Sequence, residues 1–137
     1  MMLDSAVHPE DLIGLWDSAP FEYGVMESTR LALLPDGRGW TEPANGGGTL
    51  QVRRLTWDVP RPDVIELRYA LAIDVAAAGQ EPDYEFVRTR YSIDEKELRL
   101  SELVDNVRQF ALQKRDVDVR DDASHELVPY KDAAPGA

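Results

Sequence analysis

One stretch in the middle of the chain decides the fold, and it reads Val64-Ile65-Glu66-Leu67-Arg68-Tyr69-Ala70-Leu71-Ala72-Ile73-Asp74-Val75. Larger apolar residues occupy every second position from Ile65 to Ile73, and small or charged residues lie between them. Successive side chains of a β-strand point to opposite faces, so this pattern predicts a strand with one buried and one solvated face. Such strands are typical of antiparallel sheets.

Similar strand-like runs lie on both sides of this stretch, and turn-forming residues separate them. Pro35-Asp36-Gly37 predicts one hairpin turn, and Asp94-Glu95-Lys96-Glu97 predicts another polar turn. Eight segments are expected to be extended: one beginning at Leu15-Trp16, then 24–34, 38–42, 49–59, 64–75, 84–93, 98–103 and 107–115. Because the connections are short, neighbouring segments must be antiparallel.

Closure of these strands into a barrel removes the exposed edges that an open sheet would leave. We therefore predict an all-β fold, an eight-stranded antiparallel up-and-down barrel, over residues 1–115; a two-sheet sandwich of the same strands is the alternative. A short helical turn is expected from His8 to Ile13, because proline at position 9 suits a first helical position. Residues 116–137 are polar and end in Pro and Gly, which predicts a flexible tail.

Composition limits the partners. The chain has 137 residues, a length typical of one domain, with 26 acidic against 15 basic residues and a net charge of -11. Nucleic acid is not an expected partner, because phosphate binding needs a clustered basic face, whereas a basic protein or a cationic ligand suits an acidic surface. There is no Cys, no apolar run near the ~20 residues of a membrane-spanning helix and no signal-peptide pattern, so a cytoplasmic location is expected.

Gly14-Leu15-Trp16 follows the expected helical turn and precedes the run of strands. This arrangement resembles the G-x-W signature of the calycins, the lipocalin and fatty-acid-binding barrels, and is most similar to small bacterial lipocalin-like domains. The resemblance implies a barrel closed at one end by Gly14 and Trp16, with Arg115 or Lys114 from the last strand packed across the indole. The second lipocalin motif, T-D-x-x-Y, has no counterpart between Tyr91 and Leu98.

Several side chains on presumed inner faces are candidates for a ligand site. The aromatic residues either line a cavity or fill the core, since an eight-stranded barrel is just wide enough for either; they are Trp40, Trp57, Tyr69 and Tyr91.

Glu27 and Glu85 share strand faces with apolar residues, so each is expected either inside the barrel with a partner or at its mouth in water. Arg54 is the candidate partner, because the apolar residues of segment 49–59 change face. That change implies a β-bulge at Arg53-Arg54 that turns one guanidinium inward.

Three functions are compatible with these observations. The first is non-catalytic binding of a small apolar or amphipathic ligand in the barrel. The second is a cyclase or isomerase in which Glu27 or Glu85 acts as general acid or base. The third is an immunity-type inhibitor of a basic protein that uses exposed acids of the turns and tail: Asp94, Glu95, Glu97, Asp116, Asp118, Asp121 and Asp122.

No cofactor or metal is expected. The two histidines, His8 and His125, lie near opposite ends of the chain. The aspartates from Asp116 to Asp122 lack the central Gly and the terminal Glu of a calcium loop.

Overall fold

The computed structural model describes residues 9–21, 28–45, 48–49, 51–74, 79–105 and 107–117. Almost all of the regular structure in these residues is strand. The strands are β1 (Gly14–Asp17), β2 (Ser28–Leu33), β3 (Arg38–Asn45), β4 (Gly48–Thr49), β5 (Gln51–Arg61), β6 (Val64–Asp74), β7 (Gly79–Pro82), β8 (Phe86–Asp94), β9 (Glu97–Val104) and β10 (Val107–Lys114).

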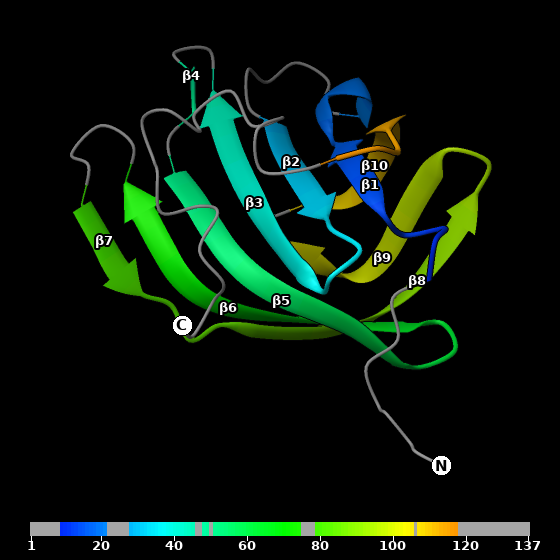
Figure 1. Cartoon of the computed structure of the whole chain (residues 1–137). Coiled ribbons are helices and arrows are strands. Elements are labelled where there is room, and N and C mark those ends of the chain that lie inside the picture. The colour runs from blue at the N-terminus through cyan, green and yellow to red at the C-terminus, as the bar shows by residue number, and fades with distance from the viewer. Residues whose placement is uncertain are drawn as a thin grey trace.

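Eight of these strands form a closed antiparallel barrel (Figure 1). Each of β1, β2, β3, β5, β6, β8, β9 and β10 pairs with the next, and β10 pairs with β1 to complete the circle. The two short strands are additions, since β4 pairs with the end of β3 and β7 with the end of β6. The predicted all-β, eight-stranded up-and-down barrel is therefore confirmed, and the sheet closes instead of dividing into a sandwich.

The N-terminal turn differs in detail from the expected one. Residues 9–13 form a hydrogen-bonded turn, in which the amides of Leu12 and Ile13 donate to the carbonyls of Pro9 (3.0 Å) and Glu10 (3.1 Å). The one helical element of the described residues is instead a single 3-10 turn, η1 (Ala19–Phe21), which follows β1. His8 lies outside the described residues.

Apolar side chains fill the inside of the barrel. Trp16, Leu55 and Phe110 are fully buried there, and each belongs to a different strand. The inner core consists of Leu12, Trp16, Leu31, Leu33, Leu55, Trp57, Val59, Ile65, Leu67, Tyr69, Val87, Leu98, Leu100, Val104, Val107 and Phe110. Burial of this apolar surface is the main force that holds the barrel closed.

A second apolar cluster lies on the outer face of the barrel. Trp40 of β3 is paired with Ala32 of β2 and Arg54 of β5, and side chains alternate along each strand, so all three point away from the inner core. The outer cluster consists of Leu15, Ala32, Leu34, Trp40, Val52, Ile73 and Val117, with Leu71 packed against it. Val117, two residues past the predicted end of the barrel domain, is thus buried; residues 118–137 are not described.

A β-bulge in β6 explains how one strand serves both clusters. Arg54 pairs with Leu71 and Leu55 pairs with Tyr69, so Ala70 is an extra residue in the ladder. Tyr69 therefore faces the inner core, whereas Leu71 and Ile73 face outward. The alternation from Ile65 to Ile73 predicted a single buried face, and it is wrong at these last two positions.

One end of the barrel is closed by the N-terminal turn. The indole Nε1 of Trp16 donates to the carbonyl of Leu12 (2.9 Å), and Arg115 Nη1 donates to the carbonyls of Glu10, Asp11 and Ile13 (2.9, 2.8 and 2.8 Å). The cation–π contacts found among the described residues involve Arg30, Arg53, Arg68 and Arg88, so Arg115 secures the turn through its carbonyls and not by stacking on Trp16.

Gly14 enters β1 where β10 comes very close. A Cβ atom at Gly14 would lie 2.7 Å from Leu112 Cδ1 and 2.9 Å from the carbonyl oxygen of Lys114. Its φ of +154° is also one that residues with a side chain rarely adopt. Glycine is therefore required at this position for β10 to close against β1.

Candidate functional site at the open end

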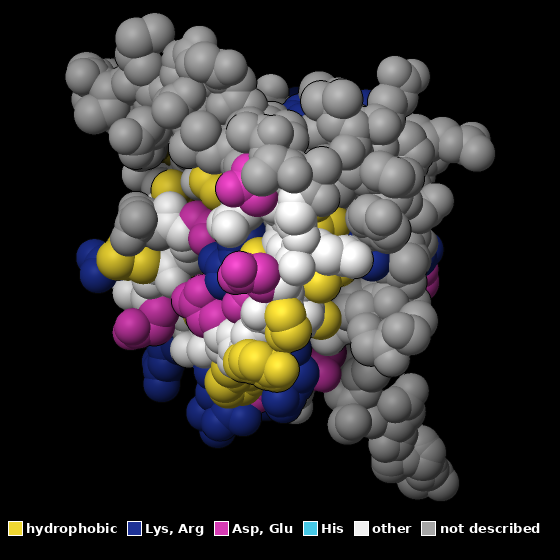
Figure 2. Space-filling view, turned by 90° about the vertical axis from the view of Figure 1, so that its left-hand side faces the viewer, with side chains coloured by type: hydrophobic (Ala, Val, Ile, Leu, Met, Phe, Trp, Pro, Cys, Tyr) yellow, Lys and Arg dark blue, Asp and Glu magenta, His cyan; other side chains and the backbone are white. Residues whose placement is uncertain are grey.

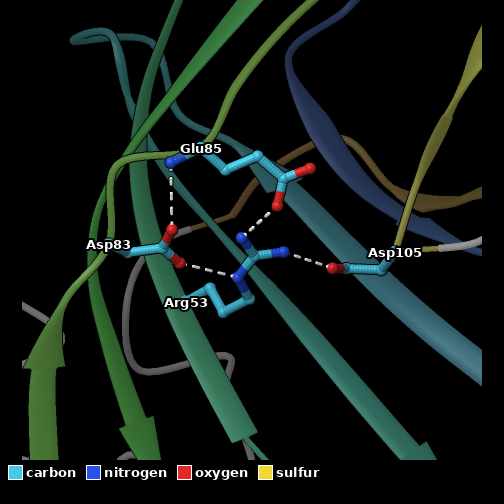
Figure 3. Close-up of polar contacts among 4 residues, drawn as sticks. All are labelled: Arg53, Asp83, Glu85 and Asp105. Atoms are coloured by element: carbon cyan, nitrogen blue, oxygen red, sulfur yellow. Dashed lines mark hydrogen bonds and ion pairs between the residues drawn. The ribbon is translucent and has the colours of Figure 1, made fainter.

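Arg53 lies at the centre of a polar cluster (Figure 3). The cluster is near the start of β5, at the end of the barrel away from the N-terminal turn, which we call the open end. Its Nε donates to Asp83 Oδ2 (2.8 Å), its Nη2 to Glu85 Oε1 (2.5 Å) and its Nη1 to Asp105 Oδ1 (2.5 Å). One guanidinium thus joins three carboxylates that come from separate parts of the chain. We call Arg53, Asp83, Glu85 and Asp105 the mouth cluster.

Irregularities in the sheet bring these residues together. Asp83 and Glu85 lie in the break between β7 and β8, opposite the bulge at Ala70. The amide of Asp83 donates to the carbonyl of Ala70 (3.1 Å), that of Tyr69 to the carbonyl of Glu85 (3.0 Å), and that of Glu85 to Asp83 Oδ1 (3.1 Å). The bulge and the break therefore hold two carboxylates over the barrel.

Asp105 approaches from the turn between β9 and β10. Its φ of +49° is in the left-handed region, which aspartate tolerates better than most residues. Arg53 itself is on β5, directly opposite Thr41 of β3, and lies on the same inner face as the core residue Leu55, two positions further along the strand. The inner face of β5 thus changes from apolar to cationic as the strand reaches the mouth.

The mouth cluster is largely withdrawn from solvent. The side chains of Arg53, Asp83 and Asp105 are 12%, 12% and 10% exposed, whereas that of Glu85 is 49% exposed. Burial alone would lower the pKa of Arg53, but the hydrogen bonds to Asp83 and Glu85 raise it overall. Burial likewise raises the pKa of Asp83, and the hydrogen bonds from Arg53 and the Glu85 amide outweigh it, so that the net shift is downward.

Two buried hydroxyl groups lie beside the cluster. The guanidinium carbon of Arg53 lies 3.8 Å from the centre of the Tyr69 ring. Burial raises the pKa of the Tyr69 phenol and the charge of Asp105 raises it further, more than Arg53 and the Thr41 hydroxyl lower it. Tyr69 is 5% exposed and Thr41 is fully buried. Among the described residues, Tyr69 OH, Thr41 Oγ1 and Asp105 Oδ2 are buried without a well-aligned hydrogen bond, although the Tyr69 and Thr41 hydroxyls lie close enough to affect one another.

The cluster carries an excess of negative charge. One guanidinium against three carboxylates leaves two negative charges, and Arg53 occupies the point where the carboxylates converge. Within the part of the chain that is described, no group of three or more His, Asp or Glu side chains is arranged to hold a metal ion.

The surface beside β7 has an acidic centre with hydrophobic and basic side chains below it (Figure 2). Tyr84, between the two carboxylates of the β7–β8 break, is 87% exposed, and Phe86 is 44% exposed. Arg68 and Arg88 flank the Phe86 ring, at 4.6 and 5.7 Å from its centre. This stacking covers part of the Phe86 ring on the outer face of the barrel.

The four aromatic residues predicted to line a ligand cavity do not gather in one place. Trp57 is packed in the inner core, and its Nε1 donates to the carbonyl of Leu34 (3.0 Å). Tyr91 is half-buried near the closed end, where burial and then the charges of Asp63 and Asp11 raise its pKa. Trp40 faces outward, and only Tyr69 of the four lies beside the mouth cluster.

Arg54, the predicted partner of Glu27 or Glu85, also faces outward, where it is buried beside the outer cluster and paired with Trp40. The sequence predicted a bulge at Arg53-Arg54, but the register shift falls between Arg54 and Leu55 and the extra residue is in β6. The guanidinium that turns inward is that of Arg53. Glu85 lies at the mouth in an ion pair and half exposed, and Glu27 is outside the described residues.

Two hollows near the closed end of the barrel are open to solvent. A hollow of about 520 Å³ at the closed end is lined by Glu10, Asp11, Ile13, Pro35 and Arg115. The inner aromatic side chains thus take part in packing, and the polar atoms without partners are concentrated at the opposite end.

No family model matches the chain, and no curated protein or solved structure matches it significantly. Among the described residues, no helix is long and apolar enough to cross a membrane.

Proposed function

We propose that the chain is a non-catalytic binding protein of lipocalin-like type, which takes a small amphipathic ligand at the open end of its barrel. The observation that carries this proposal is the set of buried polar atoms without partners beside the mouth cluster: Tyr69 OH, Thr41 Oγ1 and Asp105 Oδ2. A buried polar group that makes no hydrogen bond destabilises a fold by about 1–3 kcal/mol. A ligand that bonds to these atoms would remove that cost.

The packing of the barrel limits the shape of the ligand. Below the mouth, Leu55 and Phe110 are fully buried in the inner core, so a long apolar tail has no ready path down the barrel axis. Binding therefore depends on the polar end of the ligand at the mouth, and the apolar part is short. Membership of the calycins belongs to the same proposal, supported by Gly14 and Trp16 at the closed end of an eight-stranded barrel.

Chemical-shift mapping by NMR tests the site directly. The ¹⁵N-labelled full chain is titrated with 1-hexanol, hexanoate and hexylamine, which share one apolar group and differ in the polar end. We expect at least one of them to shift the amides of Arg53, Glu85 and Asp105. The amides of Gly37 and Lys96, at the opposite end, serve as the control. If no probe shifts the open end, or if both ends shift equally, the proposed site is wrong.

A further inference from the structure

The atoms without partners at the mouth differ in what they can bond. Asp105 Oδ2 belongs to a carboxylate that is ion-paired with Arg53, so it can only accept hydrogen bonds. The hydroxyls of Tyr69 and Thr41 each offer an oxygen lone pair as well as a proton. A group that donates several hydrogen bonds therefore suits the chemistry of all three atoms, whereas a carboxylate ligand would face the acceptor of Asp105 with no proton to offer.

The net charge of the mouth cluster also favours a ligand group that donates hydrogen bonds and is positively charged. The mouth cluster holds two negative charges beyond the one that Arg53 neutralises, and Asp83 and Asp105 are nearly nine-tenths buried or more. Charges in such a position are weakly screened by water and salt. An anion would be repelled here, and a cation would be attracted.

We infer that the open end of the barrel binds an ammonium group, which donates hydrogen bonds to Asp105, Tyr69 and Thr41. This inference rests on the proposed function and adds the chemical class of the ligand. An ammonium group has three N–H donors and one positive charge, which matches the three acceptors and part of the excess charge. It comes either from a free small amine or from a lysine side chain of a partner protein, and the chemistry at the site is the same.

The first experiment compares polar ends at a constant apolar group. The affinity of the full chain at pH 7 is measured by NMR titration for hexylamine, hexyltrimethylammonium, 1-hexanol and hexanoate. We expect hexylamine to bind about tenfold or more tightly than the alcohol and the carboxylate, because hydrogen bonds to charged groups are the stronger ones. Hexyltrimethylammonium, which has the charge but no N–H donor, should bind less tightly than hexylamine.

A matched pair of variants locates the ammonium. Tyr69→Phe keeps the ring under Arg53 and removes only the hydroxyl, so it should weaken hexylamine binding about tenfold. Tyr91→Phe removes the corresponding hydroxyl near the closed end and should leave the affinity unchanged. Asp105→Asn, which keeps an oxygen for Arg53 but loses the charge, should weaken hexylamine binding more than binding of 1-hexanol. The amide signals that hexylamine shifts in the wild-type spectrum locate its binding site without the use of a variant.

The source of the ammonium is tested with two peptides that differ at one position. One has a central lysine and the other has norleucine in its place. Preference for the lysine peptide, with or without binding of hexylamine, supports the ammonium site and identifies a protein as its source.

Two results overturn the inference. If hexanoate or 1-hexanol binds as tightly as hexylamine, the inference of an ammonium ligand is wrong, but the proposed ligand site is retained. If no probe and neither peptide shifts the amide signals at the open end, the proposed ligand site is wrong as well. Ordered water alone then bonds to these atoms.

Discussion

Replacement of Arg53 by methionine should destabilise the barrel strongly, and the effect should depend on pH. Arg53→Met keeps most of the apolar volume but leaves Asp83, Glu85 and Asp105 facing one another. Asp83 and Asp105 are only 12% and 10% exposed, so each becomes a buried charge without its partner, whereas Glu85 is half solvated and contributes little. Removal of one partner from a buried ion pair typically costs about 3–5 kcal/mol. For a domain of this size, that corresponds to a fall in Tm of roughly 10–20 °C.

The dependence on pH follows from the carboxylates. The pKa of Asp83 is lowered in the folded state, so its contribution to stability is present above the pKa of the unfolded chain and is lost as pH falls through the folded value. In Arg53→Met that contribution is absent, and protonation relieves the repulsion. The difference in unfolding free energy between wild type and variant should therefore be largest at pH 7 and shrink towards pH 3.

Urea denaturation followed by tryptophan fluorescence at pH 7, 5 and 3 measures this difference. Arg38→Met is the matched control, since Arg38 pairs with Asp36 at the surface, where the two side chains are 34% and 50% exposed. Its cost should stay within about 1 kcal/mol. The reasoning is refuted if Arg53→Met costs no more than the control, or if its cost is the same at all three pH values.

Three further predictions concern packing, titration and the closed end. Gly39→Ala should lower stability by about 1–3 kcal/mol in urea denaturation, because the added Cβ would lie 2.5 Å from the Ala32 carbonyl oxygen, whereas Gly79→Ala, with nothing within 4 Å, should be nearly neutral. Tyr69→Phe should leave stability at pH 7 unchanged or raise it. Because burial raises the pKa of Tyr69 in the folded state, the variant should also lose less stability than the wild type above the ordinary phenol pKa of 10. Unfolding curves from pH 7 to 11 check both effects. Arg115→Ala removes one cation from three carbonyls and should increase amide hydrogen exchange at Leu12 and Ile13 without affecting Asp105.

The number of strands, their order and the closure of the barrel could be predicted from the sequence, because they depend on local alternation and short turns. The mouth cluster could not, because its members are separated by up to 52 positions and meet only in the closed sheet. One signal was present: Arg53 occupies an inward position on β5 in register with Leu55 and Trp57. That signal was obscured because Val52 is also apolar. If the barrel had a single core, Val52 and Leu55 would both have to face it, and the strand would have to change face between them.

The existence of two apolar clusters resolves that ambiguity and also accounts for β6. A strand can contribute to both clusters in two ways: it places apolar residues on both faces of an unbroken alternation, or it shifts by one residue where the clusters meet. In β6 the shift is the bulge at Ala70, whereas β5 keeps a strict alternation, with Val52 outside and Arg53 and Leu55 inside. The sequence pattern of β6 shows no shift, because the residues on both sides of Ala70 keep the same spacing.

The two ends of the barrel use buried polar groups differently. At the closed end, the indole of Trp16 and the guanidinium of Arg115 bond to carbonyls of the N-terminal turn. At the open end, Arg53 and its carboxylates are buried beside hydroxyls that have no partner, an arrangement that apolar side chains of similar volume would often match or exceed in stability. Stability alone therefore accounts for the closed end but not for Tyr69 and Thr41 at the open end. Hydroxyls kept there at a cost in free energy are consistent with binding at the mouth and not deeper in the barrel.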